Sequence, residues 1–271
     1  MDIHKRIADR RKALGLTQQA LAEKLNVSFQ AVSKWESSTT CPDVSLLPAL
    51  AAALQTSIDA LLGFCTHPLT AYDERYRTDG YYWGLAPNAL CYEIMRLRPP
   101  VKPYKVLDIG CGEGKDAVFL ARNGYRVTAF DISEQGLAKA RELAGHCGVH
   151  VDFFKADVRE FVPEDEYDII FSSGVFHYIP ADRRAGIIDS LKAHTAAGGL
   201  HALNVFVRKP FIPLPPDIED AELAAGDWRS GELFTYYHDW LFLKNEEMIF
   251  DCSSGGVPHR HCMDILIAES C

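Results

Sequence analysis

The sequence lacks the patterns that mark a membrane-spanning, zinc-finger or disulfide-stabilised protein. Its 271 residues contain no stretch approaching the ~18 consecutive apolar residues of a membrane span, and its first residues carry no apolar signal core. None of the eight cysteines forms a Cys-x-x-Cys pair, so we expect reduced thiols. Internal repeats and low-complexity segments are also absent. These absences favour a soluble cytoplasmic protein with no membrane partner.

Charge is divided unevenly along the chain. The net charge is −9, yet residues 1–64 hold seven basic and six acidic side chains, which leaves −10 for the remainder. An acidic bulk argues against a protein that binds nucleic acid over its whole surface, but it allows a locally basic head. The length exceeds a single domain of about 100–150 residues, so we expect two domains.

The first sixty residues predict a small all-α domain. Gly15 ends a first helix, and Thr17 and Ser28 are suited to cap the second and third. Two short helices joined by a tight turn are typical of helix-turn-helix geometry. We expect five helices, over residues 3–14, 17–25, 28–36, 43–54 and 59–63.

The strings TQQALAEKLNVSFQAVSKWE and SIDALLG closely resemble the Xre/lambda-repressor-like family, over residues 3–63. The resemblance implies a recognition helix in the major groove of double-stranded DNA and a homodimer on half-sites about one helical turn apart. Phe29 and Ser37-Ser38 depart from the family pattern, which leaves the operator sequence open. A fold retained for dimerisation or protein contact is the alternative. The DNA-binding residues implied are Gln18, Ser28, Gln30, Ala31 and Lys34, with Trp35 in the core.

A linker and an aromatic segment follow over residues 65–100. His67-Pro68 interrupts any periodicity, and the next stretch, YDERYRTDGYYWGLAPN, is rich in tyrosine. One interpretation is that these rings pack against the second domain. The other is a lid, in which Trp83 faces a cationic ligand through its ring quadrupole. The sequence leaves both open.

The passage KVLDIGCGEGKDAVFLARNGYRVTAFDIS predicts a strand, a glycine turn, a helix and a second strand that ends in an acid. Glycines in the turn let the backbone approach a ligand. Asp131, about twenty residues after the turn, is placed to accept hydrogen bonds from ribose hydroxyls. Nicotinamide enzymes share this plan, so the passage alone identifies a nucleotide-like ligand without naming it.

Three details favour another cofactor. The spacing is GxGxG rather than GxGxxG, Asp108 precedes the first glycine, and a third strand ends in Ala156-Asp157-Val158. Together these features resemble class I S-adenosylmethionine-dependent methyltransferases. The cofactor-binding residues expected are Trp83, Asp108, Gly110, Cys111, Gly112, Asp131, Ile132, Asp157, Val158 and Ser173.

The rest of the chain predicts the remainder of that fold. YDIIFSSGVFHYI is typical of a fourth strand with its loop, and the last two apolar runs, around residues 240–253 and 259–269, predict a hairpin. We therefore expect, over residues 101–271, an α/β Rossmann-like methyltransferase domain with a seven-stranded sheet and a terminal antiparallel hairpin. It follows the five-helix domain of residues 1–64.

The acceptor is less well defined. No Asn-Pro-Pro-Tyr-like tetrad follows strand four, which argues against a DNA base. The candidates on the acceptor side are His177, Tyr178, His259, Arg260 and His261, and of these we expect His177, Tyr178, His261 and Arg260 to be catalytic. These residues are alternatively surface or supporting groups. On the last strand His259-x-His261-Cys262 suggests a metal, but neighbours on one strand cannot converge on an ion, so we predict no metal site.

The segment GELFTYYHDWLFLKNEE, with HRHCMDILIAE, resembles the tail of the tellurite-resistance type of methyltransferase. The resemblance implies a small-molecule acceptor that is a soft nucleophile, such as tellurite, selenite or a thiol. The Pro-rich segment 208–228 departs from the family pattern and is expected to shape the acceptor pocket. The alternative function is a transcription regulator that senses the cofactor without turnover.

Overall fold

The computed structural model describes residues 3–54, 56, 58–62, 71–213, 228–252 and 258–271. The chain forms two compact units, residues 1–69 and residues 70–271. No helix within the described ranges is long and apolar enough to cross a membrane. Of the segment predicted to shape the acceptor pocket, residues 214–227 lie outside the described residues.

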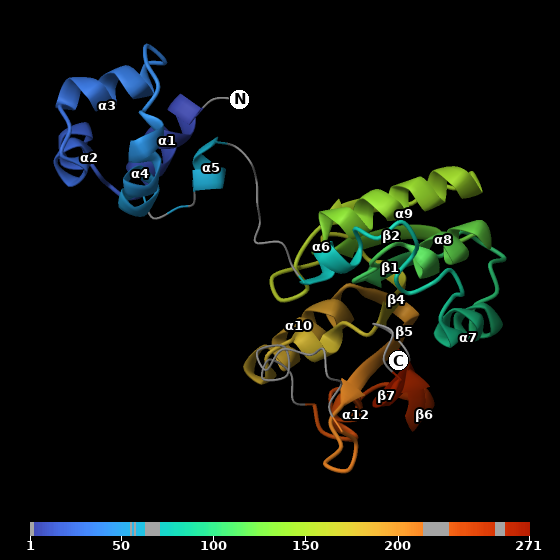
Figure 1. Ribbon diagram of the computed structural model, residues 1–271. Helices are drawn as coiled ribbons and strands as arrows, with labels where there is room; N and C mark the ends of the chain where they lie inside the picture. Colours follow the sequence, from blue (N-terminus) through green and yellow to red (C-terminus); the bar gives the residue numbers. More distant parts are fainter. Residues whose placement is uncertain (1–2, 55, 57, 63–70, 214–227, 253–257) are drawn as a thin grey trace. The chain divides into compact units, whose positions relative to one another are not determined.

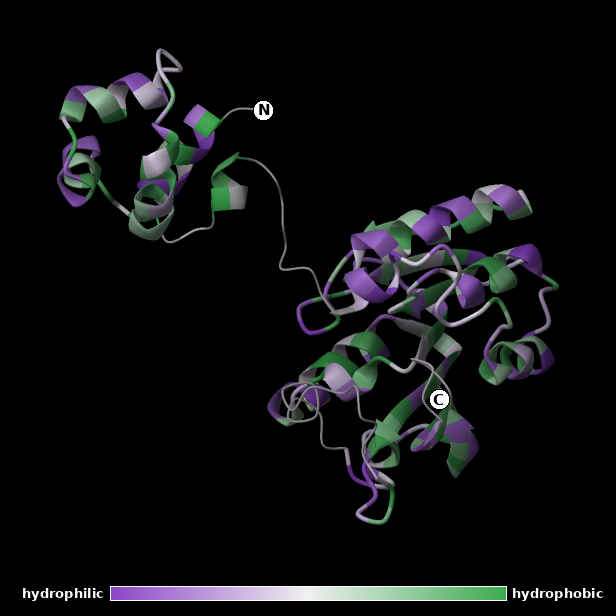
Figure 2. Ribbon diagram, in the orientation of Figure 1, coloured by the Kyte–Doolittle hydropathy of each residue, from purple (hydrophilic) through white to green (hydrophobic). Residues whose placement is uncertain are grey.

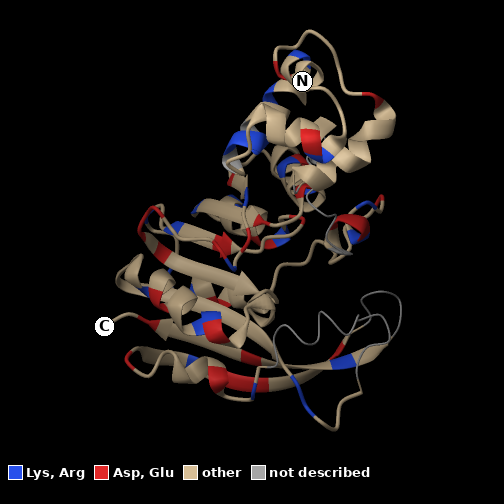
Figure 3. Ribbon diagram, turned by 90° about the vertical axis from the view of Figure 1, so that its left-hand side faces the viewer, with Lys and Arg blue, Asp and Glu red and all other residues tan. Residues whose placement is uncertain are grey.

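The first unit is all-α. Lys and Arg recur along α1 (Figure 3). Its core gathers leucines with Ile7, Val32 and Trp35, so the predicted core position of Trp35 is confirmed. Its elements are α1 (Ile3–Ala13), α2 (Gln18–Leu25), α3 (Phe29–Glu36), the 3-10 turn η1 (Val44–Leu46), α4 (Leu47–Ala53) and α5 (Ile58–Leu62).

Side-chain caps fix where these helices begin. The hydroxyl of Thr17 accepts a hydrogen bond from Ala20 N at 3.0 Å, and that of Ser28 accepts one from Ala31 N at 3.2 Å, as predicted. The prediction of a single helix over residues 43–54 is wrong in one respect. The segment begins with a 3-10 turn, and the α-helix starts only at Leu47, because Pro48 is tolerated only in the first turn of an α-helix.

The second unit contains a seven-stranded sheet with the order β3-β2-β1-β4-β5-β7-β6. Strands β1 to β5 are parallel, and β7 runs antiparallel between β5 and β6, so the predicted terminal hairpin is confirmed. The strands are β1 (Lys105–Ile109), β2 (Arg126–Asp131), β3 (Asp152–Lys155), β4 (Tyr167–Ser173), β5 (Thr195–Val207), β6 (Leu241–Cys252) and β7 (His259–Glu269).

Helices cover both faces of this sheet (Figure 1). One face packs against α7, α8 and α9, and the other against α10 and α12. Apolar residues concentrate in the strands and alternate with polar ones along α9 (Figure 2). The helical elements are α6 (Ala71–Arg75), α7 (Ala89–Leu97), α8 (Lys115–Arg122), α9 (Glu134–Cys147), η2 (Phe176–Tyr178), α10 (Ala181–Ala193) and α12 (Glu232–Thr235).

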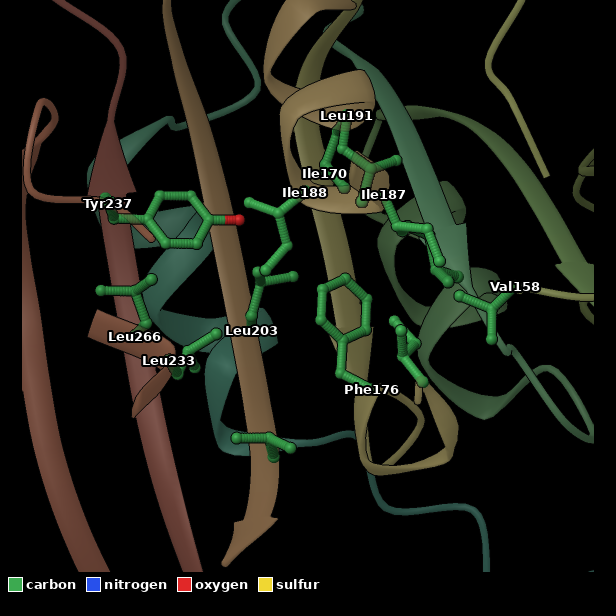
Figure 4. Packing of buried hydrophobic residues seen from close by; sticks show 14 of the residues in the cluster. Val158, Ile170, Phe176, Ile187, Ile188, Leu191, Leu203, Leu233, Tyr237 and Leu266 are labelled. Carbon is green, nitrogen blue, oxygen red and sulfur yellow. The ribbon is translucent and has the colours of Figure 1, made fainter. Parts of the chain in front are cut away.

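The core beneath α10 brings together distant parts of the chain. Phe176 and Ile188 pack with Leu203 from β5 and Leu266 from β7, and all four are fully buried (Figure 4). This packing fixes the loop after β4 to the sheet. In a parallel sheet the carboxyl ends of the strands meet at one edge, where ligands bind in open α/β folds. The candidate residues at the ends of β1, β2 and β4 therefore share that edge.

Candidate functional site

The turn after β1 has a left-handed backbone at three glycines. Gly110, Gly112 and Gly114 have φ angles of 73°, 54° and 83°. A Cβ atom added to Gly112 would lie 2.9 Å from the hydroxyl of Tyr76 and 4.0 Å from Cδ1 of Trp83. The turn therefore requires glycine for its conformation and for the close approach of the aromatic segment.

Asp131, at the end of β2, holds this turn in place. Its carboxylate accepts hydrogen bonds from the backbone N–H of Gly112 and of Ser133, both at 2.8 Å. The side chain is buried, and this burial raises its pKa despite the two amides. Asp131 thus presents a preorganised carboxylate beside the glycine turn.

A second buried carboxyl group lies beside it on β1. Asp108 is 1% exposed, and its Oδ2 atom has no hydrogen-bond partner among the described residues. Burial, followed by the charge of Asp116, raises its pKa well above the ordinary value. Asp116 itself is satisfied, by the N–H of Asn88 at 2.6 Å and by Lys115 Nζ at 2.9 Å. Of Asp108 and Asp116, only Asp108 therefore has an oxygen available to a ligand.

The aromatic segment is tied down over the turn. The indole N–H of Trp83 donates to the hydroxyl of Tyr76 at 3.1 Å, and its backbone N–H donates to Glu113 at 3.4 Å. Lys139 of α9 pairs with Glu113 at 2.9 Å and donates to the carbonyls of Thr78 and Gly80. The rings thus lie against the glycine turn, an arrangement that both the packing and the lid interpretations require.

The other predicted cofactor residues differ in how they are held. Burial alone would raise the pKa of Asp157, but hydrogen bonds from Arg159 outweigh it, so this pKa lies below the ordinary range. Val158 and Cys111 are buried, and Ile132 is half-buried. Asp157 is therefore already engaged by a cation of its own loop, unlike Asp108.

Ser173, at the end of β4, is the centre of a network that the sequence did not reveal. Its hydroxyl oxygen accepts from the side-chain amides of Asn88 at 2.8 Å and Asn204 at 3.1 Å, and Asn204 accepts from Gly174 N at 2.7 Å. Asn88 caps α7, which is a recognisable sequence signal. Asn204 is a polar residue within the mostly apolar strand LHALNVF, which also contains His201, so it is a weaker signal.

Asp73 was also missed. Its carboxylate accepts from the hydroxyl of Ser133 at 2.6 Å, so it anchors the segment around α6 to the N-terminus of α9. The sequence offers no sign of this contact, because the two residues are 60 positions apart.

The structure brings three of the four residues expected to be catalytic together through ring contacts. The rings of His177 and Tyr178 have centroids 4.0 Å apart, and Phe206 lies 4.9 Å from His177 and 4.6 Å from His261. Burial, with a smaller contribution from His261, lowers the pKa of His177 to about 3. Its Nδ1 atom is buried and has no hydrogen-bond partner among the described residues. Tyr178 is hydrogen-bonded through its hydroxyl to that of Tyr72.

Arg260 is not brought into this group. It is exposed, and strand alternation directs it to the opposite face of β7 from His261. Its assignment as an acceptor-side residue lacks structural support, because neighbouring residues on a strand point to opposite faces.

In the first unit, the residues predicted to contact DNA fall into two groups. Gln30 and Lys34 are exposed on α3, Ser28 is exposed at its N-cap, and Ala31 is half-buried. Gln18 instead donates to Glu36 at 2.8 Å, and Arg11 pairs with the same carboxylate at 2.6 Å. Gln18 is thereby oriented at the start of α2 by an internal ion pair.

Two family models match the chain. The model described as tellurite resistance protein TehB matches residues 88–253, and that described as helix-turn-helix matches residues 7–61. A relative named a probable S-adenosyl-L-methionine-dependent methyltransferase TehB, from Haemophilus influenzae, is 27% identical over 197 residues, which is 72% of this chain. The chain spans 64% of that relative's length.

Solved structures have the same fold. TehB from Haemophilus influenzae superposes with a TM-score of 0.60 at 24% identity, covering 74% of this chain and 66% of that one. The N-methyltransferase NodS from Bradyrhizobium japonicum, in complex with S-adenosyl-L-homocysteine, gives 0.55 at 15% identity, covering 74% and 97%. At these identities the similarity establishes the fold alone.

Proposed function

The chain belongs to the TehB family of tellurite resistance proteins, and on that premise we propose that its second unit transfers a methyl group from S-adenosylmethionine to a small acceptor. The domains that carry this function are residues 101–271, with residues 65–100 as lead-in and residues 1–64 as a DNA-binding head. One observation carries the proposal. It is the buried Oδ2 of Asp108 beside the glycine turn, which has no hydrogen-bond partner within the described part of the chain.

The residues present fit this cofactor. A buried carboxyl group with an unused acceptor costs free energy unless a donor reaches it, and the ammonium of an amino acid is such a donor. Asp131, with its orientation fixed by two backbone amides, accepts hydrogen bonds from ribose hydroxyls. Tyr76 and Trp83 lie directly against the glycine turn.

The bound cofactor supplies an electrophilic methyl group on a sulfonium. The chain contributes orientation and exclusion of water, since methyl transfer is an in-line displacement. The rings of His177, Tyr178 and Phe206 form an aromatic wall. Aromatic faces stabilise a sulfonium cation through their quadrupoles. An acceptor that attacks as an anion needs no base, which favours a soft nucleophile such as tellurite, selenite or a thiolate.

Release of S-adenosylhomocysteine by the purified full-length chain tests this proposal. We would measure it with tellurite, selenite and small thiols, and analyse the headspace for methylated product. Asp108→Asn is the test variant, and the exposed Asp165→Asn is its matched control. We expect turnover with one acceptor class, retained in Asp165→Asn and lost in Asp108→Asn together with cofactor affinity. Cofactor binding without turnover on any acceptor would instead favour the sensor.

For the first unit we propose sequence-specific binding to double-stranded DNA through α3, as a dimer. The exposed Gln30 and Lys34 on one short helix support this assignment, since a recognition helix reads base edges with such groups. In a mobility-shift assay, Gln30→Ala with Lys34→Ala should abolish specific binding while the helical circular dichroism is kept. Lys24→Ala, an exposed lysine on α2, is the control. Unchanged affinity in the double variant would contradict the role of α3.

A further inference from the structure

Three side chains of the kind that bind transition metals lie close together where β6 ends and β7 begins. Cys252 is the last residue of β6, and it pairs across the strands with His259, the first residue of β7. His261 lies two residues further along β7, so strand alternation places it on the same face. Residues directly opposite in an antiparallel pair also share a face, which brings Cys252 to the two histidines.

The ligand atoms are already close to the separations that one metal ion requires. The Sγ atom of Cys252 and one ring nitrogen from each histidine all lie within 4.8 Å of one another, and His259 Nε2 is 2.8 Å from His261 Nε2. Around a tetrahedral Zn²⁺, bond lengths of about 2.0–2.3 Å place ligand atoms roughly 3.3–3.6 Å apart. Small side-chain rotations at three half-buried residues bridge the difference.

The chemistry of this donor set is specific. A thiolate and two imidazoles are ligands that Zn²⁺ prefers, whereas Mg²⁺ and Ca²⁺ require oxygen. The two histidine nitrogens face each other at hydrogen-bond distance, so only one of them carries a proton in that contact. An ion between them would replace a single shared proton by two coordinate bonds.

We propose that Cys252, His259 and His261 bind one Zn²⁺ ion, with a fourth position open to water. This site replaces the expectation of no metal, which considered neighbours on β7 and overlooked the cysteine of β6. The ring of His261 is separated from that of His177 by the single ring of Phe206. The ion would thus lie beside the acceptor side. Its binding is independent of whether methyl transfer occurs.

Cobalt titration of the metal-free, untagged full-length chain tests the site. We expect one Co²⁺ per chain, with ligand-field bands of a four-coordinate ion and a thiolate-to-cobalt charge-transfer band. Cys252→Ser should remove the charge-transfer band, and His259→Ala or His261→Ala should weaken binding at least about tenfold. Cys41→Ser is the matched control. Its Sγ also lies near a histidine, 3.8 Å from His4 Nε2, in the first unit.

A second measurement keeps the proposal testable if Cys252→Ser does not fold. Zn²⁺ should protect Cys252 of the wild-type chain from alkylation, as read by peptide mass spectrometry, while the half-buried Cys147 stays equally reactive. Absence of a charge-transfer band in the wild type would overturn the site. So would a band that persists in Cys252→Ser, or alkylation of Cys252 at the same rate with and without Zn²⁺.

Discussion

Two parts of the candidate site at the carboxyl ends of the strands are built in different ways. We call the turn after β1 the glycine side and the ring cluster of His177, Phe206 and His261 the acceptor side. On the glycine side, a left-handed turn is held by the carboxylate of Asp131, and short stretches of chain determine most of the geometry. On the acceptor side, His177, Phe206 and His261 come from three segments and meet only through ring packing. The glycine side thus depends on backbone conformation, and the acceptor side on tertiary contacts between distant side chains. Substitutions should therefore separate the two sides.

The largest effect should follow from a side chain in the glycine turn. In Gly114→Ala the added Cβ would lie 2.6 Å from Cβ and 2.9 Å from Cα of Ala140, at a φ of 83°. Left-handed strain costs about 1–2 kcal/mol and overpacking about 1–3 kcal/mol. We expect urea unfolding to show a loss of about 2–5 kcal/mol. Gly148→Ala, at a φ of 64° with nothing within 4 Å, should show the strain alone. Equal losses in both would mean that the turn can relax.

A second pair of variants separates binding from turnover. Asp131→Ala removes the acceptor of two backbone amides and of the proposed ribose contacts. We expect cofactor affinity to fall by about 1.5–3 kcal/mol, or roughly 10- to 150-fold, in calorimetry. His261→Ala should leave that affinity within about twofold, which is under 0.5 kcal/mol, while lowering turnover of the acceptor. If His261→Ala weakened the cofactor as much as Asp131→Ala, the division into two sides would fail.

Acid should act on the glycine side and on the buried His201 of β5 with opposite signs. Burial, then the charge of Lys192, lowers the pKa of His201 to about 3. Its ring is hydrogen-bonded to the hydroxyls of Tyr237 and Thr195. Below pH ~6.5 the histidine of the unfolded chain binds a proton that the buried ring of the folded chain does not. The free energy of unfolding is therefore unaffected by His201 above that pH and falls as pH decreases toward 3. At pH 5 the loss is roughly 2 kcal/mol.

Asp108 and Asp131 behave in the opposite way. Their pKa values are raised, so above pH ~3.9, the pKa of Asp in an unfolded chain, the folded chain binds more protons than the unfolded chain. Acidification therefore reduces the free-energy cost of burying these two carboxylates on the glycine side. We would measure unfolding free energy from pH 7 to pH 5 in wild type, His201→Gln and the exposed His150→Gln. Only His201→Gln should reduce the acid dependence, without abolishing it, because the buried His177, whose pKa is also lowered to about 3, is present in all three proteins. The same slope in all three would contradict the assignment.

The same difference explains what the sequence could predict. The spacing of Gly110, Gly112 and Asp131 follows from one continuous strand-turn-helix-strand unit, so the fold and this half of the site could be inferred from local pattern. The contacts of Asp73 with Ser133, and of Asn204 with Ser173, join segments with no shared periodicity. The pairing of Cys252 with His259 depends on hairpin register, which alternation along one strand does not reveal. Arg260 was selected by its residue type, but it is exposed, and alternation along β7 directs it to the opposite face from His261.

Trp83 gives the smallest and most discriminating test, because the sequence left its role open. In Trp83→Phe the backbone hydrogen bond to Glu113 is kept, but the indole N–H to Tyr76 is lost. One such hydrogen bond is worth about 0.5–1.5 kcal/mol, so we expect cofactor affinity to fall roughly 2- to 10-fold. Tyr92→Phe, which alters an exposed ring on α7, should have no effect on it. If Trp83→Phe instead kept full cofactor affinity and raised only the KM of the acceptor, the aromatic segment would belong to the acceptor side. The glycine turn, which this segment contacts, would then lie between the cofactor and the acceptor.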